Sequence, residues 1–324
     1  MFSFVIFEIK KLKNTQALTV SNIRQETLNS VVISFEIPSN LKSQYAFKAG
    51  QYLTLSSNIN GEKVKRSYSI CSSPESMSLQ VGVKAIENGV FSNYVNDALR
   101  EGDSIEVSVP EGRFVLNDNP VANYCAFVAG SGITPLMSIV SDVLSKNESS
   151  VFIMGYGNKT KASTMFTSDI EELKSLYPKR FYCYNIYSKE NNPEAAFGRI
   201  DSNFINYILK QHSDVIFEKV LLCGPEKMIE DSKETLEKAN YSKDKVLYEL
   251  FYSKPAVEDN EKGKGSSAKI IYDEETLDLE VPEKMTILDA ALQKNIDVPY
   301  SCQGGVCSSC IAKITSGTAT MIQN

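Results

Sequence analysis

The chain has 324 residues, of which 42% are hydrophobic, and this length is enough for two or three domains with cores of their own. Its formal net charge of −6, without a long basic run, argues against nucleic acid as a partner. The seven cysteines are an odd number and mostly scattered, which is not the pattern of a secreted disulfide framework. No apolar run reaches membrane-spanning length, so the sequence predicts a cytoplasmic protein without a membrane partner.

Residues 1–115 are rich in alternating, β-branched segments such as LTVSNIRQETLNSVVISFEIP. Asn60-Gly61 separates two of these segments, and this dipeptide is the strongest short signal of a β-hairpin. One short helix is expected at FSNYVNDALREG, closing on Gly102. Many strands with a single helix favour a small antiparallel β-barrel.

From 116 to 252 the pattern changes to short apolar runs that alternate with helical stretches. Strands are expected at YCAFVA, SSVFIMGY, RFYCYNIYS, KVLLCG and KVLYELFY. Helices are expected between them at PLMSIVSDVLS, TSDIEELKSLY, DSNFINYILKQ and PEKMIEDSKETLEKA. This alternation is typical of a parallel, doubly wound α/β sheet.

Residues 253–267, SKPAVEDNEKGKGSS, have the composition of a linker. The remaining residues, 268–324, predict a β-hairpin and then one helix, from Ile287 to Lys294, which leads into a cysteine-rich loop. This last segment has eight Asp and Glu residues against four Lys and Arg residues. Its acidity suits either an ordinary solvated surface or docking onto a basic protein.

The loop PYSCQGGVCSSC places Cys302, Cys307 and Cys310 in a C-x4-C-x2-C spacing. Plant-type ferredoxins use this spacing to hold a [2Fe–2S] cluster, which needs four ligands. No cysteine follows Cys310, so we expect that the sequence stops before the fourth ligand. The alternative is a loop that holds no metal.

Two further motifs point to anionic ligands. RSYSICSSP places Arg66 near the end of a predicted strand, and in VKAIENGVFSNYV the residues Gly89 to Ser92 open a helix. An arginine and a helix N-terminus in one β domain predict a pyrophosphate site, with Tyr68 available to stack on a flat ring. Alone, the first motif favours an ordinary exposed strand, and the helix start in the second motif is what shifts the interpretation to a binding site.

In the α/β segment, AFVAGSGITP and LLCGPEKM both place small residues between a strand and a helix. Ligands of open α/β sheets bind at the carboxyl ends of the strands, which is where both turns are expected. Tight structural turns are the alternative reading of each motif. Cys125, Cys183 and Cys223 lie in apolar runs, where free cysteine usually serves as a small hydrophobic residue.

The order of RSYSI, NGVFSNY, AGSGITP, YGNKT, LLCGP and YELF resembles the ferredoxin–NADP⁺ reductase superfamily, and the cysteine loop extends the resemblance over nearly the whole chain. The subgroup of reductase subunits from phenylacetyl-CoA epoxidase systems is especially similar. The resemblance implies a multidomain protein with an FAD-binding antiparallel β-barrel over 1–115 and an NAD(P)-binding α/β domain over 116–252. After the linker it implies a [2Fe–2S] β-grasp domain over 268–324 that is incomplete at its C-terminal end.

The resemblance also implies roles for individual residues. On the flavin, Arg66 would bind the pyrophosphate, Tyr68 would lie on the isoalloxazine and Ser69 would lie near N5. The other residues implied to hold FAD are Val83, Lys84, Gly89, Val90, Phe91 and Ser92. Cys302, Cys307 and Cys310 would ligate iron.

On the pyridine nucleotide, Thr134 would lie close to both rings, and Cys223 would pack beside nicotinamide C4. We therefore expect Ser69, Thr134 and Cys223 to be the catalytic residues. The implied nucleotide-binding residues are Gly130, Gly132, Thr134, Pro135, Lys159, Ser188, Lys189, Gly224 and Pro225. Lys159 and Lys189 stand where the family often has arginine, but lysine still offers charge to a 2′-phosphate. NADPH is therefore favoured, with NADH as the alternative.

The implied function is a reductase that passes electrons from NADPH through FAD and a [2Fe–2S] cluster to an oxygenase protein, in phenylacetyl-CoA ring epoxidation. A nicotinamide delivers two electrons as hydride and the cluster accepts one at a time, so a flavin must stand between them. The alternative is a cluster-free NAD(P)H:flavin diaphorase or a docking subunit of an oxygenase.

Overall fold

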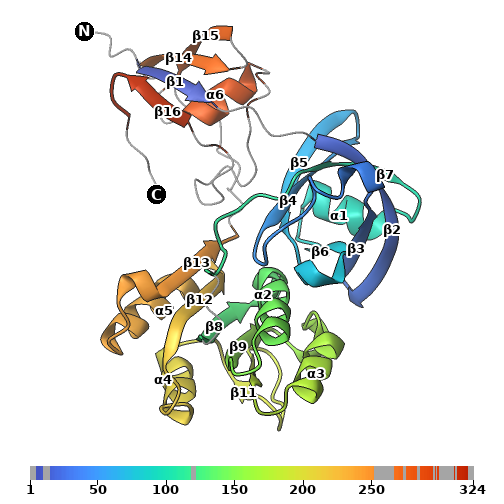
Figure 1. Cartoon of the computed structure of the whole chain (residues 1–324). Coiled ribbons are helices and arrows are strands. Elements are labelled where there is room, and N and C mark those ends of the chain that lie inside the picture. The colour runs from blue at the N-terminus through green and yellow to red at the C-terminus, as the bar shows by residue number, and fades with distance from the viewer. Residues whose placement is uncertain are drawn as a thin grey trace. The chain divides into compact units, whose positions relative to one another are not determined.

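The computed structural model describes residues 5–9, 15–117, 122–251, 266–272, 275–282, 285–294, 296, 298, 310 and 312–319. The chain divides into two units (Figure 1). One unit is Ala17–Phe251, and the other combines Met1–Gln16 with Tyr252–Asn324. Each unit has a hydrophobic core of its own.

The first part of the larger unit is an antiparallel sheet that curls into a barrel. Its described strands are β2 (Thr15–Thr27), β3 (Ser30–Glu36), β4 (Tyr52–Ile59), β5 (Glu62–Ser69), β6 (Leu79–Lys84) and β7 (Ser104–Ser108). They pair in the order β5-β4-β7-β2-β3-β6, and an isolated bridge between Ile70 and Val81 joins the two edges. Val31, Ile33 and Phe35 alternate along β3 and point into the barrel core. The predicted antiparallel barrel is thereby confirmed.

The turn between β4 and β5 is Asn60-Gly61, with φ values of +53° and +85°. Two successive positive φ angles are what a type I′ hairpin turn requires, which explains the choice of these two residues. The helix predicted in this region is α1 (Val90–Asp97), which buries Phe91 and Val95 against the barrel core. It therefore ends earlier than predicted, ahead of Gly102.

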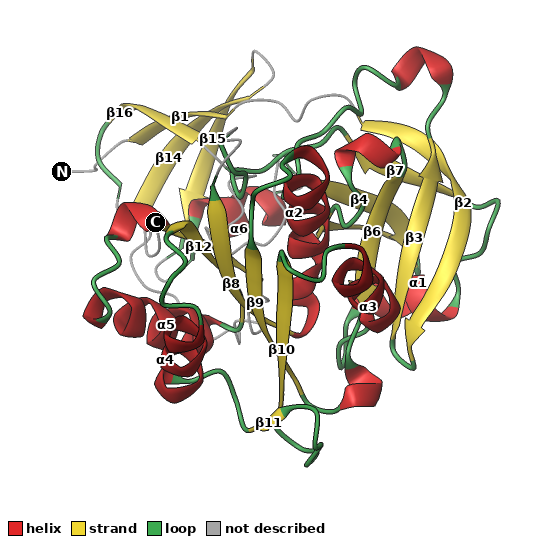
Figure 2. Ribbon diagram, turned by 60° about the horizontal axis from the view of Figure 1, so that its bottom comes forward, coloured by secondary structure: helices red, strands yellow, loops and turns green. Residues whose placement is uncertain are grey.

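The rest of this unit is a parallel sheet with helices on both faces (Figure 2). Its described strands pair in the order β11-β10-β9-β8-β12-β13. They are β8 (Asn123–Ala129), β9 (Phe152–Asn158), β10 (Phe181–Tyr187), β11 (Ala196–Phe197), β12 (Phe217–Gly224) and β13 (Val246–Leu250). The helices are α2 (Ile133–Lys146), α3 (Thr167–Leu176), α4 (Ser202–Gln211) and α5 (Glu226–Lys238). The predicted doubly wound α/β architecture is confirmed.

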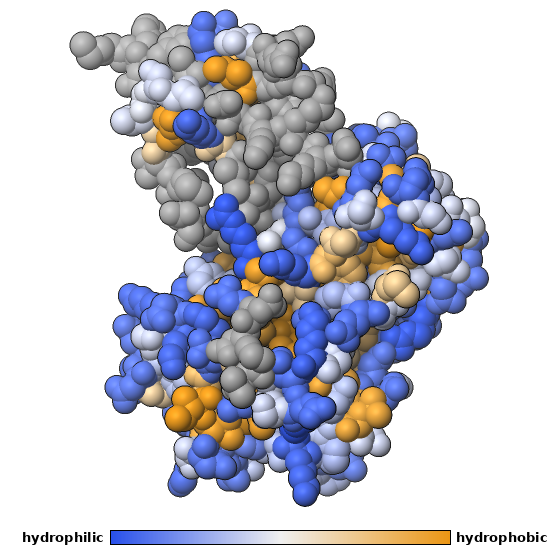
Figure 3. All heavy atoms as spheres, in the orientation of Figure 1, coloured by the Kyte–Doolittle hydropathy of each residue, from blue (hydrophilic) through white to orange (hydrophobic). Residues whose placement is uncertain are grey.

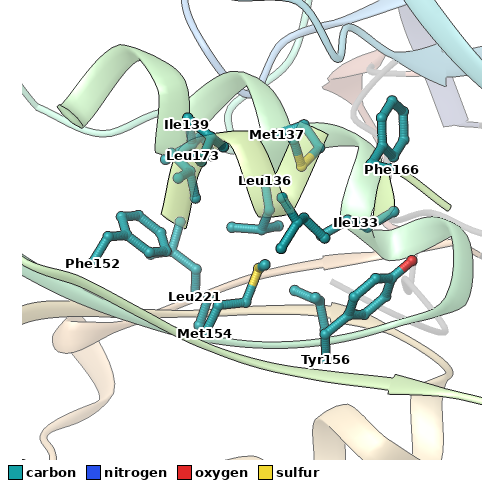
Figure 4. Packing of buried hydrophobic residues seen from close by; sticks show 14 of the residues in the cluster. Ile133, Leu136, Met137, Ile139, Phe152, Met154, Tyr156, Phe166, Leu173 and Leu221 are labelled. Atoms are coloured by element: carbon teal, nitrogen blue, oxygen red, sulfur yellow. The ribbon is translucent and has the colours of Figure 1, made fainter. Parts of the chain in front are cut away.

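Successive residues of the central strand β8 face opposite sides of this sheet. Tyr124, Ala126 and Val128 belong to the core under α2 and α3, in the same cluster as Leu136 and Met154, which Figure 4 shows. Cys125 and Phe127 belong to the core under α4 and α5. A strand buried on both faces reads as a continuous apolar run, as the YCAFVA segment does.

The barrel and the α/β sheet share buried side chains. Val32, Cys71 and Phe114 of the barrel region pack in the same cluster as α2 and β9. Ser138 on α2 also donates a hydrogen bond of 2.6 Å from Oγ to the carbonyl oxygen of Ser72. The two parts are therefore joined by a common core, and the flavin-type and nucleotide-type motifs belong to one unit.

The smaller unit contains the hairpin and the helix that were predicted before the cysteine loop. β14 (Ser266–Tyr272) pairs with β15 (Glu275–Val281), and α6 (Ile287–Gln293) follows. Thr286 caps the helix by accepting a hydrogen bond of 3.1 Å from the backbone N–H of Asp289. Alanines of α6 pack on Ile270 and Leu279 of the hairpin, which forms a small core.

The N-terminal strand differs from the prediction. The sequence predicts a barrel domain that starts at residue 1, whereas β1 (Val5–Ile9) pairs in parallel with β14 and antiparallel with β16 (Ala312–Ser316). In this position β1 supplies partners for the backbone groups of two strands, which would otherwise present open edges. An apolar, β-branched run such as VIFEI favours a strand with a neighbour on each side, but nothing in its pattern indicates which strands these neighbours are.

Within the described part of the chain, none of the helices combines the length and the apolar character needed to cross a bilayer. Figure 3 shows hydrophilic residues over much of the visible face of residues 17–251, with apolar residues in separate patches.

Candidate functional site

The motif RSYSI forms the end of β5, and α1 lies beside it. The rings of Tyr68 and Phe91 have their centroids 5.8 Å apart, so the strand and the first turn of the helix are neighbours. Arg66 is exposed, and its guanidinium donates a hydrogen bond of 2.6 Å to the carbonyl oxygen of Lys65. Burial raises the pKa of the Tyr68 phenol, and the nearby Arg66 charge opposes this shift. The structure therefore brings together the cation, the aromatic ring and the helix start that the sequence predicted.

The first turn of α1 is available to an anion. Its N-cap is Gly89, and no side chain caps the helix. Ser92 Oγ, a natural capping group, instead accepts a hydrogen bond of 3.3 Å from the backbone N–H of Ile86. A Cβ added at Gly89 would overlap Ser92 Oγ and the Ile86 side chain, so this approach requires glycine. The N–H groups of Val90 and Phe91 thus face no side-chain acceptor, which suits a phosphate group.

Ser69, Val83 and Lys84 occupy three different environments. Ser69 is buried at the end of β5, and the Val83 side chain is part of the barrel core. Lys84, the last residue of β6, reaches across to the α/β part and donates a hydrogen bond of 3.2 Å to the carbonyl oxygen of Ser163. Partial burial lowers the pKa of the Lys84 ammonium, and the positive charge of Lys159 lowers it further.

The two small-residue turns of the α/β part meet at the carboxyl ends of β8 and β12, as their strand positions predict. Gly130–Gly132 forms a short 3₁₀ turn before α2, with φ of +56° at Gly130. A Cβ added at Gly132 would overlap the carbonyl oxygen of Cys223, so the turns are in backbone contact. Thr134 is buried and donates a hydrogen bond of 3.0 Å to the carbonyl oxygen of Ser131.

Cys223 is fully buried in the core under α2. Burial raises the pKa of its thiol well above the ordinary value, and the carboxylate of Glu249 adds to the shift. The cysteine is therefore a neutral thiol at physiological pH, not a thiolate nucleophile. The next residues differ in exposure, because Gly224 is buried with φ of +153° and Pro225 is exposed.

Lys159, Ser188 and Lys189 lie together because β9 and β10 are parallel neighbours that end at the same edge. The backbone N–H of Ser188 donates to Asn158 O at 3.0 Å, and that of Lys189 donates to Lys159 O at 2.9 Å. Both lysine side chains are exposed, and neither forms an ion pair with another residue in the described ranges. In contrast, Lys161 Nζ lies 3.2 Å from Glu194 Oε2. The arrangement offers two unneutralised cations to an anionic ligand.

The sequence reasoning missed Gly82, through which the barrel contacts the nucleotide-type turn. A Cβ added at this glycine would lie 2.7 Å from Cγ2 of Thr134 and 3.2 Å from Cζ of Phe166. β6 therefore lies directly against the start of α2. A glycine within a strand pattern, as in LQVGVK, indicates a close approach of other chain atoms, so a signal was present.

The cysteine loop lies largely outside the described residues. Cys302 and Cys307 are not among them, so their arrangement relative to Cys310 is not described. Cys310 is half-buried in a turn shortly before β16. The expected iron ligands thus stay a prediction.

Three protein-family models match the chain in succession. The model of the oxidoreductase FAD-binding domain matches residues 17–116, and that of the oxidoreductase NAD-binding domain matches residues 127–234. The model of the 2Fe-2S iron-sulfur cluster binding domain matches residues 270–323. The protein therefore combines a domain of each kind, which confirms the expected cofactors FAD and 2Fe-2S and the expected oxidoreductase class.

Two curated relatives match over most of their length. One component of the 1,2-phenylacetyl-CoA epoxidase of Escherichia coli is 35% identical over 95% of this chain and 89% of its own. The ferredoxin reductase component of the 3-ketosteroid-9-alpha-monooxygenase of Rhodococcus rhodochrous is 30% identical over 94% of this chain and 87% of its own. Among solved structures, a ferredoxin NADP⁺ reductase from Neisseria gonorrhoeae superposes with a TM-score of 0.62. It covers 73% of this chain and 98% of that one at 18% identity, which supports the fold.

Proposed function

The chain belongs to the ferredoxin–NADP⁺ reductase superfamily, in the group with a C-terminal 2Fe-2S domain, and we propose that it passes electrons from NADPH through FAD and the cluster to an oxygenase protein. The observation that carries this proposal is the contact of Gly82 with Thr134. It joins the flavin-type strand to the nucleotide-type turn, so rings held on the two sides would be neighbours.

The barrel residues fit FAD in charge and shape. Arg66 and the uncapped first turn of α1, from Gly89 to Ser92, would hold the pyrophosphate, and Tyr68 would lie on the isoalloxazine. Ser69 would face N5, and the backbone of Val83 and Lys84 would line the ring, because the Val83 side chain is committed to the barrel core. Bound FAD would accept a hydride and release its two electrons one at a time.

The turns of the α/β part would hold the nicotinamide end of the nucleotide. The turn residues Gly130 and Gly132 allow close backbone approach, and Pro135 lies in the first turn of α2, whose N-terminus favours negative charge. Thr134 would orient the nicotinamide ring over the barrel strand. Gly224 and Pro225 would close the other side of the nicotinamide site. The buried Cys223 would be a neutral packing group that helps to exclude water from this site.

NADPH is the proposed nucleotide because of the two unneutralised lysines. Lys159 and Lys189 lie at the ends of neighbouring strands and would offer positive charge to the 2′-phosphate. Ser188 lies beside them and would offer a hydroxyl group. NADH lacks this phosphate and would lose these contacts. The preference is moderate, since lysine lacks the bidentate geometry of arginine.

Cys302, Cys307 and Cys310 are the proposed iron ligands, and an oxygenase protein is the proposed acceptor. Support for the acceptor comes from the curated relatives, which belong to an epoxidase and to a monooxygenase. Of these two systems, phenylacetyl-CoA epoxidation is proposed here because it belongs to the more similar relative. The cytoplasm is the proposed location, since the cysteines are scattered and lack a disulfide framework.

The test is a comparison of the wild-type protein with a Cys307→Ser variant. In the full-length natural protein we expect the absorption bands of flavin and of the cluster, together with bound iron and sulfide. The variant should lose the cluster bands and the reduction of cytochrome c, but keep NADPH oxidation with ferricyanide, because ferricyanide takes electrons from the flavin. Wild-type protein that carries flavin alone would instead support a cluster-free diaphorase.

A further inference from the structure

Three charged side chains, none of which belongs to a cofactor motif, join the barrel to α3. Arg24 on β2 holds Asp169 on α3 with two hydrogen bonds, of 3.0 Å and 3.2 Å. The same guanidinium lies 2.9 Å from Glu26 Oε1, without the alignment of a hydrogen bond. Figure 2 shows α3 next to the barrel strands. One arginine is thus shared by two carboxylates from two parts of the unit.

Glu26 is the buried member of this cluster. Its side chain is 5% exposed, against 45% for Arg24 and 34% for Asp169. Burial raises the pKa of the Glu26 carboxyl, and the negative charge of Asp169 adds to the shift. The N–H of Phe166 and the charge of Arg24 act in the opposite direction but do not cancel it.

Glu26 also holds the chain at the start of α3. Its Oε2 accepts a hydrogen bond of 2.8 Å from the backbone N–H of Phe166, which is 140 residues away in the sequence. Phe166 is the N-cap of α3, has φ of +59° and provides no side-chain cap. A phenylalanine in this left-handed conformation is strained and needs support from its surroundings. The carboxylate from β2 gives that support and complements the helix dipole.

The residue that Glu26 holds lies at the junction of the two sites. The Phe166 side chain is buried and packs in the cluster with Ile133 and Met137 (Figure 4). A Cβ added at Gly82 would lie 3.2 Å from Phe166 Cζ and 3.3 Å from Met165 Cε, next to Thr134. A continuous path of contacts therefore runs from Glu26 through Phe166 to the point where β6 meets α2.

We propose that Glu26 is a positioning residue for hydride transfer, which fixes Phe166 against Gly82 and Thr134 and thereby sets how the nucleotide turn meets the flavin strand. Arg24 and Asp169 hold the carboxylate in place. This role rests on the proposed function, since it concerns the approach of nicotinamide to flavin. Small errors in such an approach are costly to the rate, because hydride transfer needs the reacting atoms in contact.

The direction of the pKa shift separates this role from a purely structural one. A carboxyl whose pKa is raised on folding binds its proton more tightly in the folded state, so ionising it at neutral pH lowers stability. The penalty is absent well below the raised pKa and present in full above it. A Glu26→Gln variant should therefore be at least as stable as the wild type at pH 7, while it loses the charge that holds Phe166.

The pH dependence of the turnover provides a second signature. The titratable and charged groups that act on Glu26 are Arg24, Asp169, Cys71 and Tyr156. Burial raises the pKa of Cys71 and of Tyr156, so both stay neutral over the acidic range. Wild-type kcat should fall as pH drops through the raised pKa of Glu26. Glu26→Gln imitates the protonated form and should lack this acid limb.

The experiment uses the FAD-loaded full chain with NADPH and ferricyanide, and compares Glu26→Gln and Glu26→Ala with Glu171→Gln. Glu171 is the matched control, because it pairs with Lys174 at 2.8 Å on the same helix. We expect kcat to fall on the order of tenfold in Glu26→Gln, with KM and FAD content nearly unchanged. Hydrogen exchange of the segment 164–168 should accelerate in Glu26→Ala, and Glu171→Gln should behave as the wild type in every measurement.

Two results would overturn the proposal. One is an unchanged kcat in Glu26→Gln with the wild-type acid limb retained. The other is a fall in kcat that is matched by loss of folding stability in urea, which would make Glu26 an ordinary structural residue. A wild-type protein that does not oxidise NADPH would instead contradict the proposed function, and the exchange measurement would still show whether Glu26 holds Phe166.

Discussion

The flavin-type site and the nucleotide-type turn lie in the same unit but are built on different principles. The flavin-type site presents polar groups to solvent, namely the exposed Arg66 and the uncapped first turn of α1. In the turn, Gly132 lies in backbone contact with Cys223, and Thr134 is buried. Changes at the first site should therefore alter ligand affinity and leave the fold intact, whereas changes at the second should alter geometry and stability together.

The largest effect is expected for Gly132→Ala. Its backbone angles suit alanine, but the added Cβ would overlap the carbonyl oxygen of Cys223, and backbone cannot move aside as a side chain can. We expect a loss of about 3 kcal/mol in the free energy of unfolding, near the upper end for overpacking a core. Urea denaturation would measure the loss, and NADPH oxidation should fall with it.

Gly157→Ala is the matched control, since the atoms nearest to its Cβ would all be side-chain atoms, of Ile200 at 3.2 Å and 3.3 Å and of Ile186 at 3.6 Å. A side chain can yield by these few tenths of an ångström, so this variant should lose much less stability. Equal effects of the two substitutions would mean that the turn is no more tightly built than the rest of the sheet.

The local parts of this architecture were predictable from the sequence, because short-range chemistry encodes them. Asn60-Gly61 has the two positive φ angles of its hairpin turn, and AGSGITP and LLCGPEKM end parallel neighbouring strands, which brings them together. The contacts between distant segments were not predictable in this way. Glu26 meets Phe166 across 140 residues, and β1 pairs with strands near the other end of the chain. Neither the periodicity of apolar residues nor a helix-capping pattern indicates which distant segments come into contact.

A smaller effect is expected for Arg66→Ala, which removes one cation from the flavin-type site. A hydrogen bond to a charged group is worth roughly 1.5–3 kcal/mol, so FAD affinity should fall about tenfold to a hundredfold. The unfolding midpoint of the apoprotein should not change, because the side chain is exposed. Equilibrium titration of apoprotein with FAD would measure the affinity.

Lys63→Ala is the control for Arg66→Ala. It removes one positive charge from the same strand, where Lys63 is paired with Glu106 at 2.8 Å. FAD affinity should be close to that of the wild type in this variant. If Arg66→Ala binds FAD as tightly as the wild type, the pyrophosphate is held elsewhere. Arg66 would then no longer support the contrast between a site that sets ligand affinity and a turn that sets stability.

The smallest effect is expected at the strand ends that would meet the 2′-phosphate. Lys159→Gln removes a charge that has no ion pair in the described part of the chain, whereas Lys161→Gln removes one that Glu194 already neutralises. An exposed charge pair is worth up to about 1 kcal/mol, so kcat/KM for NADPH should fall roughly fivefold in Lys159→Gln. The kcat/KM for NADH should stay the same, because NADH offers no phosphate at this place.

Added salt should weaken the wild-type preference for NADPH, because salt screens the attraction between solvent-exposed charges, with a screening length of about 10 Å at 0.1 M ionic strength. Steady-state rates with both nucleotides, for both variants, decide the matter. If Lys159→Gln and Lys161→Gln lower the NADPH rate equally, a general positive field and not the end of β9 attracts the nucleotide.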